Sequence, residues 1–271
     1  MKKCFLIILL TCSTLAHAQK RKEEPVVVSN EKTAGGVKIF ATNSAIVPFT
    51  VEISINQKNL QSDVNFPLKT VLEPGSESVL IATLTTLNKR KSWSFGYEYT
   101  FFSGDYRATH DNDFAYALPY QAGEEYLMSQ GYNGRFSHSG KNALDFTMPI
   151  GTKIVAARGG LVIEVKENSG KGCADRSCLG QANKITILHE DGTMADYAHL
   201  KKKGALVKVG DQVNKGEVIG LSGNTGYTSG PHLHFEVYLP GKGNLKSVRT
   251  KFETANGQSE YLREKVRYEA F

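Results

Sequence analysis

The chain has 271 residues, of which 40% are hydrophobic, enough for one large domain or two ordinary ones with buried cores. Its formal net charge of +6 is a mild excess, and no basic cluster with interleaved aromatic residues indicates nucleic-acid binding. No apolar run is long enough for a permanent membrane-spanning helix, so stable membrane insertion is not expected.

The first 18 residues have the pattern of a secretory signal peptide. Lys2 and Lys3 precede an apolar stretch at residues 5–10, and Ala-His-Ala at residues 16–18 forms an A-x-A cleavage site. Cleavage removes two lysines and no acidic residue, so the formal net charge falls from +6 to +4. We therefore predict export to the periplasm or the exterior, where this charge suits an anionic partner or serves solubility alone.

The four cysteines fall into two groups. Cys4 and Cys12 leave with the signal peptide, although Leu-Leu-Thr-Cys at residues 9–12 offers a lipoprotein alternative. Cys173 and Cys178 lie in a glycine-rich loop, which in an oxidising compartment predicts a local disulfide. A zinc site there would need further cysteines or histidines nearby, and none follows.

Residues 19–115 predict an N-terminal β-sandwich. FTVEISIN from Phe49 alternates strictly, SVLIATLTTL follows a turn, and SWSFGYEYTF places five aromatic residues on one face. These aromatics, at odd positions from 93 to 101, indicate the inner face of the sandwich or a ligand platform. At the following join, His110 with Asp111 and Asp113 is either a cation site or a solvated linker.

Residues 116–245 predict a second all-β domain, and residues 246–271 a tail that packs back on the core. Short β-rich runs such as TKIVAA, GLVIEVKE and NKITILHE alternate with glycine-containing turns. No helical period extends over a useful length, which predicts a compact antiparallel barrel or sandwich.

Two histidines of this domain share a strand, in SGPHLHFEVY at residues 229–238. Side chains at i and i+2 of a strand point the same way, so His232 and His234 share one face while Leu233 and Phe235 share the other. The apolar pair can face a core, which leaves the imidazoles facing a groove.

A second motif supplies further metal-binding groups, because FSHSGKNALDF contains His138 and Asp145. A catalytic zinc site needs three protein ligands and an open position for water. His138, Asp145 and one histidine of the HxH strand satisfy that need. The other histidine, with His199 as its partner, could then move a proton at neutral pH.

The zincin motif HExxH is absent, because His189-Glu190 is followed by Thr193 where the second histidine would stand. His189 ends a predicted strand at a turn. We therefore interpret His189 as structural.

These motifs resemble those of the lysostaphin/LytM-type zinc metallopeptidases, which cleave peptides in bacterial peptidoglycan. The resemblance covers about residues 128–240 and includes ALDFTMPIGTKIVAARGG, YAHL and SGNTGYTSGPHLHFEV in order. It implies the duplicated hybrid motif, a β-barrel-like sheet with a long groove. One departure is the longer spacing between the first two ligands, since six residues separate them here instead of the three of the staphylococcal HxxxD.

The resemblance also implies roles for residues. His138, Asp145 and His234 would bind one Zn²⁺ per chain, His232 and His199 would form the catalytic pair, and Tyr132 would help to hold the oxyanion.

The function implied is an exported zinc endopeptidase that hydrolyses the stem-peptide cross-links of peptidoglycan. The alternatives are a non-catalytic LytM-like module that binds wall or activates an amidase, and a non-haem iron oxygenase, since two histidines and a carboxylate also suit Fe(II). The sandwich could bind glycan, dock a partner or cover the groove as an inhibitory domain. In the last case a strand or loop from residues 100–125 could lie over the groove.

Overall fold

The computed structural model describes residues 24–243, 245–254 and 257–271, so the predicted signal peptide lies outside the described residues. The described chain is built from strands, and its one helical element is the short 3-10 turn η1 (Arg176–Cys178). The predicted all-β class is therefore confirmed. No described helix is long and apolar enough to cross a membrane.

Two sheets form a sandwich at the N-terminal side. The first has the order β1-β2-β6-β4 and the second the order β5-β3-β7. Their bounds are β1 (Val26–Thr33), β2 (Gly36–Asn43), β3 (Phe49–Lys58), β4 (Leu60–Ser62), β5 (Leu68–Leu72), β6 (Val79–Thr86) and β7 (Ser94–Ser103).

The sandwich core follows from strand alternation. Val37, Ile39 and Ala41 of β2 are fully buried, and they pack with Val51 and Ile53 of β3. The five aromatics at odd positions from 93 to 101 are half-buried against the same core, and neighbouring rings lie 6.2–6.4 Å apart. They therefore line the inner face.

A nine-stranded sheet dominates the second body, in the order β16-β12-β14-β15-β19-β10-β9-β23 with β20 beside β19. Its bounds are β9 (Glu125–Gln130), β10 (Ala143–Thr147), β12 (Gly160–Lys166), β14 (Lys184–Leu188), β15 (Met194–Ala198), β16 (Gln212–Val213), β19 (His232–Leu239), β20 (Lys246–Ser247) and β23 (Val266–Glu269). The pairings are antiparallel, and the buried face carries Phe146, Tyr197 and Phe235, each at most 1% exposed.

Smaller sheets complete this body. They are β11 (Lys153–Val155) with β17 (Val218–Leu221), β13 (Gly172–Cys173) with β18 (Gly226–Tyr227), and β8 (Ala115–Tyr116) with β21 (Lys251–Glu253) and β22 (Ser259–Glu260). A disulfide joins Cys173 to Cys178 and closes the loop around η1, as predicted.

The C-terminal segment is part of the second body. β23 adds an edge strand beside β9, and Phe252, Leu262 and Tyr268 belong to the large core. The division of the chain at residues 19–115, 116–245 and 246–271 stays a prediction.

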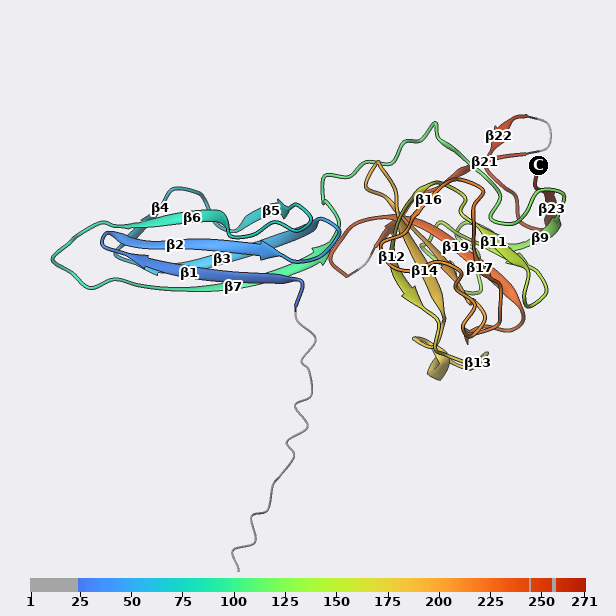
Figure 1. The fold of residues 1–271 in the computed structure, drawn as a ribbon, viewed down its shortest axis with the longest axis horizontal. Coiled ribbons are helices and arrows are strands. Elements are labelled where there is room, and N and C mark those ends of the chain that lie inside the picture. Colours follow the sequence, from blue (N-terminus) through green and yellow to red (C-terminus); the bar gives the residue numbers. More distant parts are fainter. Residues whose placement is uncertain (1–23, 244, 255–256) are drawn as a thin grey trace, which may run out of the picture.

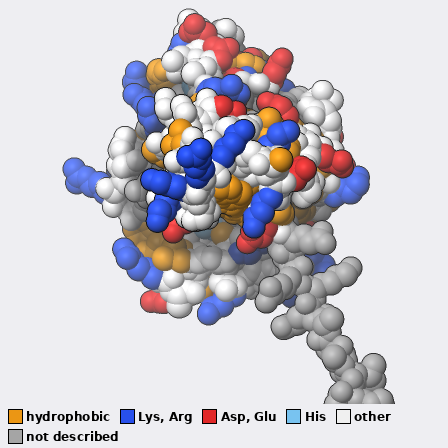
Figure 2. All heavy atoms as spheres, turned by 90° about the vertical axis from the view of Figure 1, so that its left-hand side faces the viewer, with side chains coloured by type: hydrophobic (Ala, Val, Ile, Leu, Met, Phe, Trp, Pro, Cys, Tyr) orange, Lys and Arg blue, Asp and Glu red, His pale blue; other side chains and the backbone are white. Residues whose placement is uncertain are grey.

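The two bodies lie side by side along the long axis of the molecule (Figure 1). At the joint, a Cβ on Gly104 would lie 2.5 Å from Cγ of Pro240, and one on Gly192 would lie 2.7 Å from Cβ of Ala108. At the far end of the sandwich, the loop between β6 and β7 exposes Lys89, and Lys and Arg side chains gather there around apolar atoms (Figure 2).

Candidate metal centre and groove

The HxH strand places its histidines as the alternation predicts. β19 pairs antiparallel with β10 so that Asp145 lies opposite His234. Leu233 and Phe235, which point the other way, are buried in the core. Strand pairing therefore brings a carboxylate and an imidazole together although 88 residues separate them in the chain.

A loop contributes the third side chain of the cluster. His138 ends the turn that begins at Gly134, whose carbonyl accepts the His138 backbone N–H, and its side chain is fully buried. Its Nε2 lies 3.2 Å from Oδ1 of Asp145 and 3.3 Å from Nδ1 of His234. Nδ1 of His234 lies 2.9 Å from the same Oδ1. His138, Asp145 and His234 form the one group of His, Cys, Asp and Glu side chains, within the described ranges, that could hold a metal ion.

The donor set fits a tetrahedral cation. Ligands held at about 2.0–2.1 Å in tetrahedral geometry stand roughly 3.3 Å from one another. The three observed separations of 2.9–3.3 Å approach that value. Two imidazoles and a carboxylate are also the ligands expected of a catalytic zinc site with an open position.

Each donor is oriented by a further contact. Nδ1 of His138 donates to the Gly131 carbonyl at 3.1 Å, which turns Nε2 toward Asp145 and His234. Oδ2 of Asp145 accepts a hydrogen bond from Nε2 of Gln130 at 2.8 Å. Nε2 of His234 lies 3.5 Å from the Glu236 carboxylate. Such outer contacts fix the tautomer and the orientation of metal ligands.

The charges at the centre stabilise one another. Burial alone would raise the pKa of Asp145, but hydrogen bonds with His138 and His234 hold it well below its ordinary range. Burial alone would lower the pKa of His234, but Asp145 and Glu236 raise it to about 9. Asp145 is therefore ionised beside the two imidazoles, as a carboxylate metal ligand must be.

Two more imidazoles stand beside this cluster. The rings of His199 and His232 lie 4.4 Å apart, and His199 is 5.9 Å from the ring of His234. Nδ1 of His199 donates to the Thr225 carbonyl at 2.6 Å, and Nδ1 of His232 donates to the Gly230 carbonyl at 2.8 Å. In both rings the Nε2 atom is therefore the proton acceptor.

His199 occupies this place at the cost of an unusual backbone conformation. Its φ is +64°, in the left-handed region, and it directly follows β15. Gly223 lies against this bend, because a Cβ there would come within 2.7 Å of the His199 carbonyl oxygen. Burial lowers the pKa of His199 to about 3, helped by the neighbouring His232 and His234, so this imidazole is neutral at pH 7.

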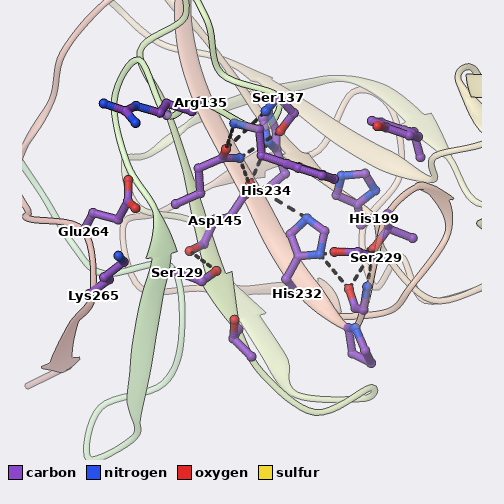
Figure 3. Close-up of a pocket in the computed structure, with 18 of the residues that line it drawn as sticks. Ser129, Arg135, Ser137, Asp145, His199, Ser229, His232, His234, Glu264 and Lys265 are labelled. Atoms are coloured by element: carbon purple, nitrogen blue, oxygen red, sulfur yellow. Dashed lines mark hydrogen bonds and ion pairs between the residues drawn. The ribbon is translucent and has the colours of Figure 1, made fainter. Parts of the chain in front are cut away.

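The cluster opens into a groove of about 820 Å³. Figure 3 shows His199 and Ser229 on one side of the ligand cluster and Arg135, Glu264 and Lys265 on the other. Residues 129–265 supply all the described lining, and none of residues 100–125 takes part. The hypothesis that residues 100–125 cover the groove was therefore wrong for the described chain.

Tyr132 also lines the groove, but its hydroxyl is engaged elsewhere. It donates to the Thr250 carbonyl at 2.6 Å, and burial raises its pKa to about 12. An oxyanion role would require this hydroxyl to leave Thr250. That role stays a prediction.

Other histidines lie outside the groove. His189 is buried, and its Nδ1 donates to the Gly159 carbonyl at 2.9 Å, in keeping with the structural interpretation. His110 contacts Oδ1 of Asn112 and the Tyr116 hydroxyl, while Asp113 pairs with Lys251. These contacts favour the linker interpretation over a cation site.

Several residues of the groove and of the metal centre were not predicted from the sequence. Glu236 could have been found, because it lies two positions beyond His234 on the same strand face. Gln130, Glu264 and Lys265 gave no such signal, since only the pairing of β9 with β10 and β23 brings them to the groove.

Comparisons with known proteins agree with this geometry. Residues 139–247 match peptidase family M23. The chain is 40% identical over 101 residues to the peptidoglycan DD-endopeptidase ShyA of Vibrio cholerae, covering 37% of this chain and 21% of that protein. It is 38% identical over 131 residues to lysostaphin of Staphylococcus simulans, covering 48% of this chain and 24% of that protein.

Among solved structures, the catalytic domain of lysostaphin from S. simulans is similar at 30% identity with a TM-score of 0.35, covering 46% of this chain and 86% of that one. A further relative is an uncharacterized metalloprotease of Buchnera aphidicola. The chain spans a third or less of the length of this protein, of ShyA and of lysostaphin. The fold and site define a metallopeptidase domain with a histidine-rich groove. Residues 139–247 form a peptidase family M23 domain, as the sequence resemblance predicted.

Proposed function

We propose that this protein is an exported zinc-dependent endopeptidase that hydrolyses peptide cross-links of bacterial peptidoglycan. The observation that carries the proposal is the convergence of three metal-binding atoms within 3.3 Å of one another, beside two imidazoles with free Nε2 atoms. Relatives named as a peptidoglycan DD-endopeptidase and as lysostaphin support the substrate class.

In this proposal His138, Asp145 and His234 hold the zinc ion. When bound, zinc supplies Lewis acidity and lowers the pKa of a bound water to about 7. Gly131, Gln130 and Glu236 orient the three ligands.

His232 and His199 are the proposed proton carriers. Carbonyl groups of Gly230 and Thr225 hold both Nδ1–H groups, so each Nε2 can accept a proton from the attacking water and return it to the leaving nitrogen. Nε2 of His232 lies 3.8 Å from Oδ1 of Asp145, which keeps this imidazole beside the ligand cluster. Tyr132 would reach an oxyanion only after releasing Thr250.

The test is mass spectrometry of muropeptides released from purified peptidoglycan by the chain without residues 1–18. We expect cross-linked dimers to disappear and free stem peptides to appear, and a zinc chelator should block both changes. His234→Ala should abolish metal binding and hydrolysis together, while His110→Ala, at a half-buried histidine outside the groove, should keep both. Full hydrolysis by His234→Ala would rule out the proposed site.

A further inference from the structure

The groove has an uneven distribution of charge. Arg135 and Lys265 line it on the side of Asp145 that faces away from His199 (Figure 3). Both side chains are exposed, and neither makes an ion pair with another residue of the described ranges. Two free cations therefore stand within reach of whatever occupies this end of the groove.

The acidic neighbour of these cations is already engaged. Oε2 of Glu264 accepts the backbone N–H of Gly131 at 3.2 Å and makes no ion pair with Lys265, although both line the groove. Glu264 thus supports the loop that carries His138, and it leaves Lys265 without a partner.

The backbones of both cationic residues are fixed. Lys265 has a φ of +66°, and its N–H donates to the Met128 carbonyl at 2.8 Å, immediately before β23. Arg135 precedes two residues, Phe136 and Ser137, whose N–H groups both donate to Oε1 of Gln130. The two cations therefore emerge from anchored positions on opposite chain segments.

Among the described residues that line the opposite end of the groove, none carries such a charge. Thr228, Ser229 and Gly230 line it with hydroxyl and carbonyl groups, and the Thr228 hydroxyl donates to the Gly230 carbonyl at 2.7 Å. A peptide that crosses the metal centre would thus meet cations on one side of its scissile bond and neutral groups on the other.

We propose that Arg135 and Lys265 bind a free carboxylate of the substrate beside the scissile bond. The groove would then prefer a cross-link in which the diamino acid keeps its carboxylate over the same cross-link with a carboxamide and over a neutral glycine bridge. This specificity rests on the proposed function.

The experiment compares two synthetic stem-peptide dimers that differ only in one group, the carboxylate of the cross-linking diamino acid, which is free in one and amidated in the other. A pentaglycine peptide serves as a neutral third substrate. We expect kcat/KM to favour the free acid by about tenfold, with the difference residing in KM, because each exposed charge pair contributes up to about fivefold. The preference should shrink at high ionic strength.

Arg135→Gln and Lys265→Met should each reduce the preference for the free acid, and the double variant should cleave the two dimers with equal kcat/KM. Arg267→Gln is the matched control, because Arg267 is a cation of β23 that pairs with Glu125 and does not line the groove. Equal cleavage of both dimers by the wild-type protein, or a preference that survives in the double variant, would overturn the inference and leave the proposed function standing. Failure to cleave any of the three substrates, or peptidoglycan itself, would count against the proposed function.

Discussion

Gln130 satisfies all four hydrogen-bonding positions of its amide around the metal centre. Its Nε2 donates to Oδ2 of Asp145 and to Oγ of Ser137, each at 2.8 Å, while its Oε1 accepts the N–H groups of Phe136 and Ser137. Gly134 leaves the space for it, because a Cβ there would lie 2.4 Å from Cγ of Gln130. One side chain thus ties the loop of the first ligand to the second ligand.

Replacing Gln130 by Met should lower the affinity for zinc by about 10- to 100-fold, because Asp145 and the loop would lose their common support. Competition with a chromogenic chelator measures this affinity. Gln181→Met, at an exposed glutamine that follows the disulfide loop, should leave this affinity unchanged. An unaltered affinity in Gln130→Met would show that the ligands are held without this network.

His189, which lies away from the groove, makes the stability of the fold depend on pH. Burial lowers its pKa to about 4, although its hydrogen bond to Gly159 opposes the shift. Between pH 6.5 and 4 the unfolded chain therefore binds a proton that the folded chain does not, so acid favours unfolding. The stabilisation is complete above about pH 6.5 and is lost progressively as the pH falls to about 4.

His189→Asn should flatten this part of the pH dependence of the free energy of unfolding, by roughly 3 kcal/mol across the window. Denaturant unfolding at pH 4.5 and 7 measures the difference between the two values. His110→Gln, which changes a half-buried histidine, should keep the slope of the wild-type protein. A variant at His189 with the full wild-type slope would contradict the assignment.

At the scale of elements, the C-terminal segment holds the loop of residues 131–142 from two sides. Thr250 accepts the Tyr132 hydroxyl, Glu264 accepts the Gly131 N–H, and Ser247 accepts the Asn142 N–H at 2.7 Å. The loop carries a metal ligand, so strands added after residue 247 contribute to the order of the site although they supply none of its ligands.

Tyr132→Phe should lower the free energy of unfolding by about 1 kcal/mol, because the Thr250 carbonyl would lose its hydrogen bond in a half-buried place. Thermal unfolding and kcat should be measured together. If the hydroxyl serves only as an anchor, kcat changes little. A fall in kcat of about 100-fold with unchanged stability would instead assign Tyr132 to the oxyanion.

The sequence predicted those parts of the site that depend on local periodicity. His232 and His234 share a face because side chains alternate along a strand, and this holds whatever the neighbouring strand is. Gln130 and Lys265 reach the groove only through the register of β9 with β10 and β23, which involves segments far apart in the sequence. The pairing of strands in the sandwich is equally non-local. The alternation of residues in β3 predicted a strand, but it did not predict that β5 and β7 are its partners.

At the scale of the whole molecule, the sandwich and the groove are separate features joined by a close contact. Gly104 follows β7 with a φ of +96°, and a Cβ there would lie 2.5 Å from Cγ of Pro240 and 2.9 Å from Cε of Met194. Lys242 reaches from the second body to Thr100 of the sandwich at 3.0 Å. The joint thus includes a position, Gly104, where only glycine fits.

Gly104→Ala should destabilise the protein by about 2–3 kcal/mol, because the new methyl group meets both a strained backbone and a filled space. Thermal unfolding should shift to lower temperature, and limited proteolysis should cut first near residues 104–113. Hydrolysis at a temperature where the variant is folded should stay at the wild-type rate, because no residue of the joint lines the groove.

Gly96→Ala is the matched control on the same strand, since a Cβ there meets nothing within 4 Å, and it should change stability by no more than about 0.5 kcal/mol. A Gly104→Ala variant as stable as Gly96→Ala would show that the two bodies can move apart without cost. A Gly104→Ala variant that folds but hydrolyses slowly would show that the position of the sandwich controls the groove, although the sandwich contributes no side chain to the groove.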